Sequence, residues 1–97
     1  MNKTYNICTQ SPMGKLNGVL HLLFENNNLQ AIIDFNGKKL NFYNGELLPN
    51  NKFKFDGLMK VYFKKIKYSA EGFFSDSNVE INISSNIGNF TITGVAA

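Results

Sequence analysis

Few residues of this chain have side chains suited to acid–base, nucleophilic or metal chemistry. With a single Cys8 and a single His21, the chain cannot assemble a Cys/His zinc site or an intramolecular disulfide. His21 stands between Leu20 and Leu22, which places it on the outer face of a strand without a nearby carboxylate. We therefore expect Cys8 to be an inert strand residue and His21 to be a surface residue.

The carboxylates are scattered beside turns or on the polar positions of strands. They are Glu25, Asp34, Glu46, Asp56, Glu71, Asp76 and Glu80. No Gly-x-Ser-x-Gly elbow, phosphate loop or dinucleotide motif accompanies them. We expect no enzyme activity, no catalytic residue, no metal site and no cofactor. The alternative of a cryptic enzyme would need polar side chains that converge inside the fold.

The chain carries ten basic and seven acidic residues, for a formal net charge of +3. All of the basic residues are Lys, so the bidentate guanidinium that favours phosphate and guanine recognition is missing, and nucleic acid is not the expected partner. The run from Lys60 to Lys65 mixes aromatics with cations. It fits contact with a membrane surface, a partner or single-stranded nucleic acid, or simply lysines that protect a strand edge.

Length and composition indicate one folded domain over residues 1–97. Hydrophobic residues make up 43% of the chain and aromatic residues 13%, which is ample for one core. The chain is too short to form two separate cores. No stretch approaches the roughly 18 apolar residues of a membrane span, and the N-terminal segment lacks an apolar signal core. The expected location is cytoplasmic.

Apolar residues alternate with polar ones along nearly the whole chain, which is the period of a β-strand, and no helical spacing is sustained. The expected strands cover residues 3–10, 16–25, 29–35, 38–48, 52–57, 66–74, 79–83 and 89–95. The stretch Lys60 to Lys67 is less regular. The apolar parity changes between Met59 and Ile66, which predicts a turn or a bulge there.

About eight short strands joined by short turns predict an all-β, antiparallel up-and-down meander. A flat sheet would leave two unpaired edges and one bare apolar face, so the strands should stack in two layers or close. We favour a small closed barrel of the calycin or lipocalin type. Glycines fall within the strands at positions 18, 45, 57, 72 and 94, where they are expected to mark bends or close approaches.

Turn and core motifs resemble a family of small uncharacterised bacterial lipocalin-like barrels. They are Ser11-Pro12-Met13-Gly14, Gly18-x-Leu20-x-Leu22, Leu29, Phe42-x-x-Gly45, Phe53-x-Phe55-x-Gly57, Ile66-x-Tyr68 and Gly88-x-Phe90-x-x-x-Gly94. In that family the first strand ends in Thr-Pro-Met-Gly, and related domains stand beside flavin-dependent reductases of the old-yellow-enzyme type. The resemblance spans nearly the whole chain and implies the fold, but no catalytic residues.

The inward positions suggest a binding site for a small apolar or aromatic ligand. In a closed barrel the inward side chains are Tyr5, Leu20, Leu22, Phe24, Leu29, Ile33, Phe42, Phe53, Phe55, Ile66, Tyr68, Ile81, Phe90 and Ile92. An eight-stranded barrel is just wide enough either for these side chains alone or for one small ligand as well. If one mouth stays open, we expect Tyr5, Phe24, Phe42, Phe55 and Tyr68 to bind the ligand, with a Tyr5 or Tyr68 hydroxyl orienting it.

Five apolar residues fall on the outer parity instead: Val19, Leu23, Ile32, Tyr43 and Phe73. The first four come from consecutive strands that should be neighbours. They suggest the alternative function, a structural or accessory domain that forms a homo-oligomer or docks to a partner enzyme through its outer face. Isolated exposed apolar residues are also normal on any protein surface.

Overall fold

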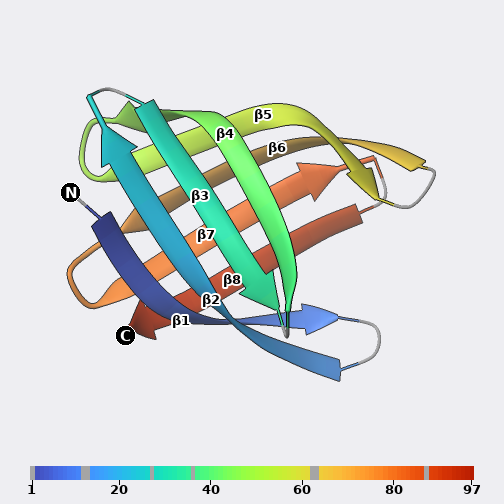
Figure 1. Cartoon of the computed structure of the whole chain (residues 1–97), viewed down its shortest axis with the longest axis horizontal. Helices are drawn as coiled ribbons and strands as arrows, with labels where there is room; N and C mark the ends of the chain where they lie inside the picture. Colours follow the sequence, from blue (N-terminus) through green and yellow to red (C-terminus); the bar gives the residue numbers. More distant parts are fainter. Residues whose placement is uncertain (1, 12–13, 27, 36, 62–63, 87) are drawn as a thin grey trace.

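The computed structural model describes residues 2–11, 14–26, 28–35, 37–61, 64–86 and 88–97. It confirms the all-β fold: eight antiparallel strands follow one another in sequence order around a closed barrel (Figure 1). The strands are β1 (Asn2–Ser11), β2 (Gly14–Glu25), β3 (Asn28–Phe35), β4 (Lys38–Leu48), β5 (Lys52–Val61), β6 (Lys64–Phe74), β7 (Asn78–Ser85) and β8 (Gly88–Ala96).

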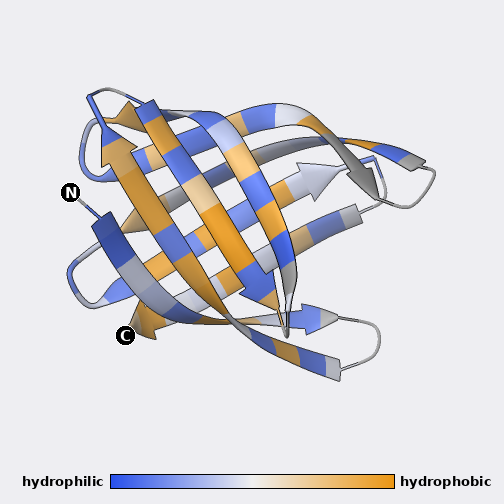
Figure 2. Ribbon diagram, in the orientation of Figure 1, coloured by the Kyte–Doolittle hydropathy of each residue, from blue (hydrophilic) through white to orange (hydrophobic). Residues whose placement is uncertain are grey.

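Alternate residues of each strand face one shared interior, as Figure 2 shows by its alternating hydrophobic and hydrophilic bands. The core holds Tyr5, Ile7, Leu20, Leu22, Leu29, Ala31, Ile33, Phe42, Phe53, Phe55, Tyr68, Ala70, Phe74, Val79, Ile81 and Ile92. The expected inward residues Phe24, Ile66 and Phe90 are only half-buried. The interior is therefore fully packed over part of its length only.

Residues that tolerate left-handed backbone angles form the turns. Asn26 has a φ of 57°, and Asn50 and Asn51 have φ of 65° and 59°. Val61 pairs with Lys64, so the chain turns between β5 and β6, inside the interval from Met59 to Ile66 where a turn or a bulge was expected. The core positions change there from odd, such as Phe55, to even, such as Tyr68, and both strand ends are continuously paired.

A β-bulge interrupts β4, which the sequence pattern did not predict. Ala31 of β3 pairs with Phe42, but Leu29 pairs with Gly45, so β4 holds one extra residue at this point. Asn44 has a left-handed φ of 59°, which accommodates the extra residue in the strand. Beyond the bulge, the inward position of β4 therefore changes from Phe42 to Gly45.

The strand layout repeats once along the chain. Each strand of the second half begins 50 residues after its counterpart: residue 52 after 2, 64 after 14, 78 after 28, and 88 after 38. The barrel is thus built from two four-stranded halves, β1–β4 and β5–β8. They meet along two lines, where β4 pairs with β5 and where β8 pairs with β1.

These two lines of pairing are short. Ten residue pairs join β5 to β6, whereas β4 and β5 share only the three pairs from Glu46–Lys54 to Leu48–Lys52. β1 and β8 share five pairs, from Tyr5–Ala96 to Thr9–Ile92. The β4–β5 line lies at the end of the barrel that holds the chain termini, which we call the closed end, and the β1–β8 line continues from there past the middle of β1 to Thr9. At the opposite, open end, the β1–β2 and β5–β6 hairpins diverge (Figure 1).

Polar and aromatic contacts seal the closed end. The buried Tyr5 hydroxyl donates a 2.7 Å hydrogen bond to the Ser75 carbonyl, and Lys3 forms a 3.0 Å ion pair with Asp76. The Phe74 N–H donates to the carbonyl of Asn51 at 3.0 Å. These contacts connect the start of β1 and the turn at Asn51 with the end of β6 and the turn that follows β6.

A column of aromatic rings runs from the closed end toward the open end. Its members are Phe24, Phe74, Phe53, Phe55, Phe42 and Tyr68. Successive ring centroids lie 5.2 to 6.2 Å apart in tilted or edge-to-face geometry. Such pairs stabilise a fold by about 0.5–1.5 kcal/mol each beyond the area they bury. Tyr68 is the last ring of the column.

The strand glycines mark close approaches, as expected. At Gly72, an added Cβ would lie 2.6 Å from the Glu80 carbonyl oxygen and 2.7 Å from Cζ of Phe53. Neither neighbour is free to move, because one is sheet backbone and the other a fully buried ring.

We therefore predict that Gly72→Ala lowers the free energy of unfolding by about 1–3 kcal/mol, the usual cost of overpacking a core. Ser69→Ala, at an exposed position of the same strand, should stay within about 0.5 kcal/mol of the unsubstituted protein. Urea denaturation of both variants measures the difference. Equal stability of the two variants would show that this contact is not tight.

Candidate ligand-binding site

An apolar cavity of about 180 Å³ opens at the open end of the barrel. Its lining residues are Thr9, Leu40, Phe42, Ile66, Tyr68, Ile83, Ser85, Phe90 and Ile92. They come from β1, β4, β6, β7 and β8, so both halves of the barrel contribute to the walls. On one side the cavity borders the stretch of β4 beyond its three pairs with β5, and on the other side it reaches the end of the β1–β8 pairing at Thr9 and Ile92.

The interior is filled below this cavity. The next void toward the middle of the barrel measures about 10 Å³ and is lined only by apolar residues, among them Ala31, Phe55 and Ala70. Because a water molecule needs at least 10–15 Å³ and polar partners, this void stays dry. Phe42 and Ile83 border both spaces and form the floor of the cavity.

Three residues of the lining carry hydroxyl groups, although the surface that faces the cavity is apolar. Two of these hydroxyls already donate hydrogen bonds within the barrel. Thr9 donates to the Thr91 carbonyl at 2.9 Å, and Ser85 donates to the Gly88 carbonyl at 2.7 Å. The Tyr68 hydroxyl has no hydrogen-bond partner among the described residues. It is therefore free to donate a hydrogen bond, but it lies beside Gly57 of β5 and not on the apolar surface of the cavity.

The Tyr68 hydroxyl lies against Gly57, to which Tyr68 is paired across β5 and β6. A Cβ at position 57 would be 3.1 Å from this oxygen, so the glycine leaves room for it. No described side-chain nitrogen or oxygen is both fully buried and without a partner, so the hydroxyl reaches solvent. It lies beside the unpaired stretch of β5, where β4 has turned away.

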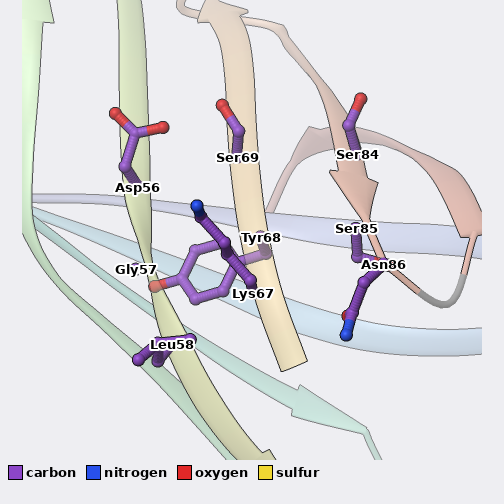
Figure 3. A pocket seen from close by; sticks show the side chains of 9 residues that line it. All are labelled: Asp56, Gly57, Leu58, Lys67, Tyr68, Ser69, Ser84, Ser85 and Asn86. Carbon is purple, nitrogen blue, oxygen red and sulfur yellow. The ribbon is translucent and has the colours of Figure 1, made fainter. Parts of the chain in front are cut away.

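A larger hollow, of about 700 Å³, lies on the outer surface of β5, β6 and β7 and shares Tyr68 and Ser85 with the cavity (Figure 3). It is a broad open groove lined by Asp56, Gly57, Leu58, Lys67, Tyr68, Ser69, Ser84, Ser85 and Asn86. Most of these residues are exposed, and Leu58 reaches 70% exposure. A shallow groove of this kind desolvates a small molecule poorly, so the smaller cavity is the better candidate site.

The structure separates the five residues expected to bind a ligand. Phe42 and Tyr68 line the cavity, and Phe55 lies one layer below it. Tyr5 and Phe24 lie at the closed end, and the Tyr5 hydroxyl is already bonded to the Ser75 carbonyl. Of the two tyrosines expected to orient a ligand, Tyr68 alone is placed to do so.

Sequence reasoning missed part of the cavity wall. Leu40, Ile83, Thr9 and Ser85 line it but were not among the expected ligand-binding residues. Their inward parity was visible in the sequence. The missing signal was the position of each residue along the barrel axis, which strand periodicity does not give.

The expected outer-face residues fall into two groups. Val19 and Leu23 of β2, Ile32 of β3 and Tyr43 of β4 lie on neighbouring strands. The first three are half-buried, whereas Tyr43 is 56% exposed. Phe73, 45% exposed, lies on β6 in the other half of the barrel and does not join them.

The remaining polar candidates form no cluster. His21 shares a 3.1 Å hydrogen bond with the Thr4 hydroxyl on the outer face, and Cys8 is half-buried without a disulfide. No group of three or more His, Cys, Asp or Glu residues suited to a metal occurs within the described ranges. Within the Lys60–Lys65 run, Tyr62 and Phe63 lie outside the described residues.

Comparison with known proteins adds no relative. No family model, curated protein or solved structure matches this chain. In the described part of the chain no helix is long and apolar enough to span a membrane.

Burial raises the pKa of the Tyr68 hydroxyl, and the nearby Asp56 carboxylate raises it further. Burial also raises the pKa of Tyr5, with a smaller effect of Asp76 in the same direction. Both hydroxyls therefore remain protonated in the folded protein at pH values where the unfolded chain begins to lose these protons, near pH 10. Tyr68 is a hydrogen-bond donor throughout the neutral range.

The raised tyrosine pKa values predict a loss of stability in alkali. The folded state retains protons that the unfolded state releases, so the stabilisation is complete below about pH 10 and is lost as pH rises beyond it. Lys3, whose pKa its hydrogen bond to Asp76 raises, acts with the same sign. Urea denaturation from pH 7 to 11 should show a shallower alkaline decline for Tyr68→Phe. An unchanged slope in that variant would contradict the assignment.

Proposed function

We propose that this protein is a non-catalytic barrel that binds one small apolar or aromatic molecule in the cavity at its open end. The observation that carries the proposal is an apolar cavity of about 180 Å³ at the open end of the barrel, walled by residues of both halves, with the partner-free Tyr68 hydroxyl just outside its apolar surface. An apolar wall with few polar groups that fix orientation is typical of small-molecule sites.

The volume limits the size of the ligand. Pockets for drug-sized molecules measure about 300–1,000 Å³, whereas an apolar cavity of about 150 Å³ is known to hold benzene. A space of about 180 Å³ therefore fits a single aromatic ring with one small substituent, or a short aliphatic chain. The Tyr68 hydroxyl favours a substituent that accepts a hydrogen bond.

Benzamide is a suitable probe, because it combines one ring with one carbonyl acceptor. We predict that it binds with a dissociation constant on the order of 1 mM, as expected for so few heavy atoms. Leu40→Trp should fill the cavity and weaken binding by at least about tenfold. Backbone amide shifts in two-dimensional NMR measure both values.

The matched control is Leu58→Trp, which adds the same indole to the outer groove. This variant should bind benzamide like the unsubstituted protein. If Leu58→Trp blocks the probe and Leu40→Trp does not, the outer groove is the site and the proposal is wrong. Absence of any benzamide-dependent shift would also contradict it.

A second candidate function is self-association through the outer face of β2–β4. Val19, Leu23, Ile32 and Tyr43 lie side by side there, and Tyr43 is more than half exposed. A stable dimer would need to bury about 1,000 Å² or more around them.

Self-association predicts a sedimentation coefficient that rises with protein concentration. Tyr43→Lys should abolish the rise, because a buried unpaired charge is costly at an interface. Phe73→Lys, at a comparably exposed aromatic of the other half, should leave it unchanged. A monomer at every concentration would exclude this second function.

A further inference from the structure

Charge is distributed unevenly along the barrel axis. Each strand can be divided at its midpoint into a half that runs to the open end and a half that runs to the closed end. The open-end halves and their turns contain Lys15, Lys38, Lys39, Lys60, Lys64, Lys65, Lys67 and Asp34. The closed-end halves and their turns contain Lys3, Lys52, Lys54, Glu25, Glu46, Asp56, Glu71, Asp76 and Glu80. The formal charge is therefore +6 around the open end and −3 at the closed end, which together give the net +3.

The lysines of the closed end are largely neutralised by neighbours. Lys3 pairs with Asp76 at 3.0 Å and Lys54 pairs with Glu46 at 3.5 Å. The exposed Lys15, Lys39, Lys65 and Lys67 take part in neither pair. Their charges are left to act on whatever approaches the open end.

Several of these lysines flank the cavity wall directly. Lys39 precedes the lining residue Leu40, and Lys65 and Lys67 stand on either side of the lining residue Ile66. An outward side chain on a strand is adjacent to the inward side chains before and after it. These three lysines, which we call the rim lysines, therefore stand on the outer side of the strands that wall the cavity.

We propose that the molecule bound at the open end is an organic anion, whose ring or short chain fills the cavity and whose acidic group stays among the rim lysines. This inference rests on the proposed function, because it concerns the same cavity. No cation lines the cavity itself, and an unpaired carboxylate inside it would be costly. The acidic group must therefore remain at the rim, where water, lysines and the Tyr68 hydroxyl can solvate it.

Two carboxylates carry negative charge that disfavours an anion near the open end. Asp34, the one carboxylate of the open-end halves, accepts a 2.9 Å hydrogen bond from the Gly37 N–H in the β3–β4 turn. Asp56 faces outward near the middle of β5 and acts electrostatically on Tyr68. It is exposed to solvent, which screens it, but its charge still disfavours an anion at the Tyr68 hydroxyl.

The test compares benzoate with benzamide, which has the same shape and no charge. At about 20 mM salt, benzoate should bind roughly tenfold more tightly, and at about 0.5 M salt this advantage should vanish by screening. Lys65→Gln/Lys67→Gln should weaken benzoate binding roughly threefold and leave benzamide unchanged. Asp56→Asn should tighten benzoate binding only.

The matched control is Lys52→Gln/Lys54→Gln, which lowers the net charge equally but at the closed end. It should leave the binding of both probes nearly unchanged. Equal affinities for benzoate and benzamide, or equal losses in the two double variants, would overturn the inference. Benzamide binding on its own would then still support the proposed function, whereas absence of binding by either probe would end both.

Discussion

The short pairing between the two four-stranded halves is the constraint on which the rest of this structure depends. Within each half, neighbouring strands pair over most of their length, but β4 and β5 share only three residue pairs. Along β4 and β5 the halves are therefore joined at the closed end and separate toward the open end, whereas β1 and β8 stay paired as far as Thr9 and Ile92 in the cavity wall. Pairing of β4 with β5 along their whole length would narrow the open end.

Aromatic packing reinforces this asymmetry. Tyr5, Phe53 and Phe74 are buried at the closed end, where the seams are paired, and their contacts tie the two halves together. Small residues such as Ala31 and Ala70 occupy the middle, where the rings of Phe42 and Phe55 fill the space. Tyr68 ends the column, so the last ring before solvent is one with a polar tip. An amphipathic ring suits such a boundary.

Electrostatics follows the same axis. Both ion pairs of the described residues involve closed-end lysines, where most of the carboxylates lie. The open end keeps its positive charge, and its unpaired strand edges also carry lysines, which discourages edge-to-edge aggregation. A single distribution of lysines thus protects exposed edges and gives the open end an excess of positive charge. These two roles are compatible, because neither requires a fixed lysine geometry.

The sequence by itself determined the strands, the turns and the side of each strand that faces the core. Alternation of residues such as Leu20, His21 and Leu22 leaves one choice of inward face, and a chain of short hairpins leaves two edges that closure removes. Phe42 and Tyr68 could be identified as ligand-facing candidates on this basis. The left-handed Asn44 that shifts the parity of β4 could not, because an Asn within a strand has no unique local signal.

Tertiary structure alone decided which part of the interior is filled and which is hollow. Period-two alternation assigns Tyr5 and Tyr68 to the same inward class, but it has no information on position along the barrel axis. That position depends on how far β4 pairs with β5 and β1 with β8, contacts between residues distant in sequence. The up-and-down strand order also brings Lys15, Lys39, Lys65 and Lys67 to the same end of the barrel, because each antiparallel hairpin returns the chain to one of two ends.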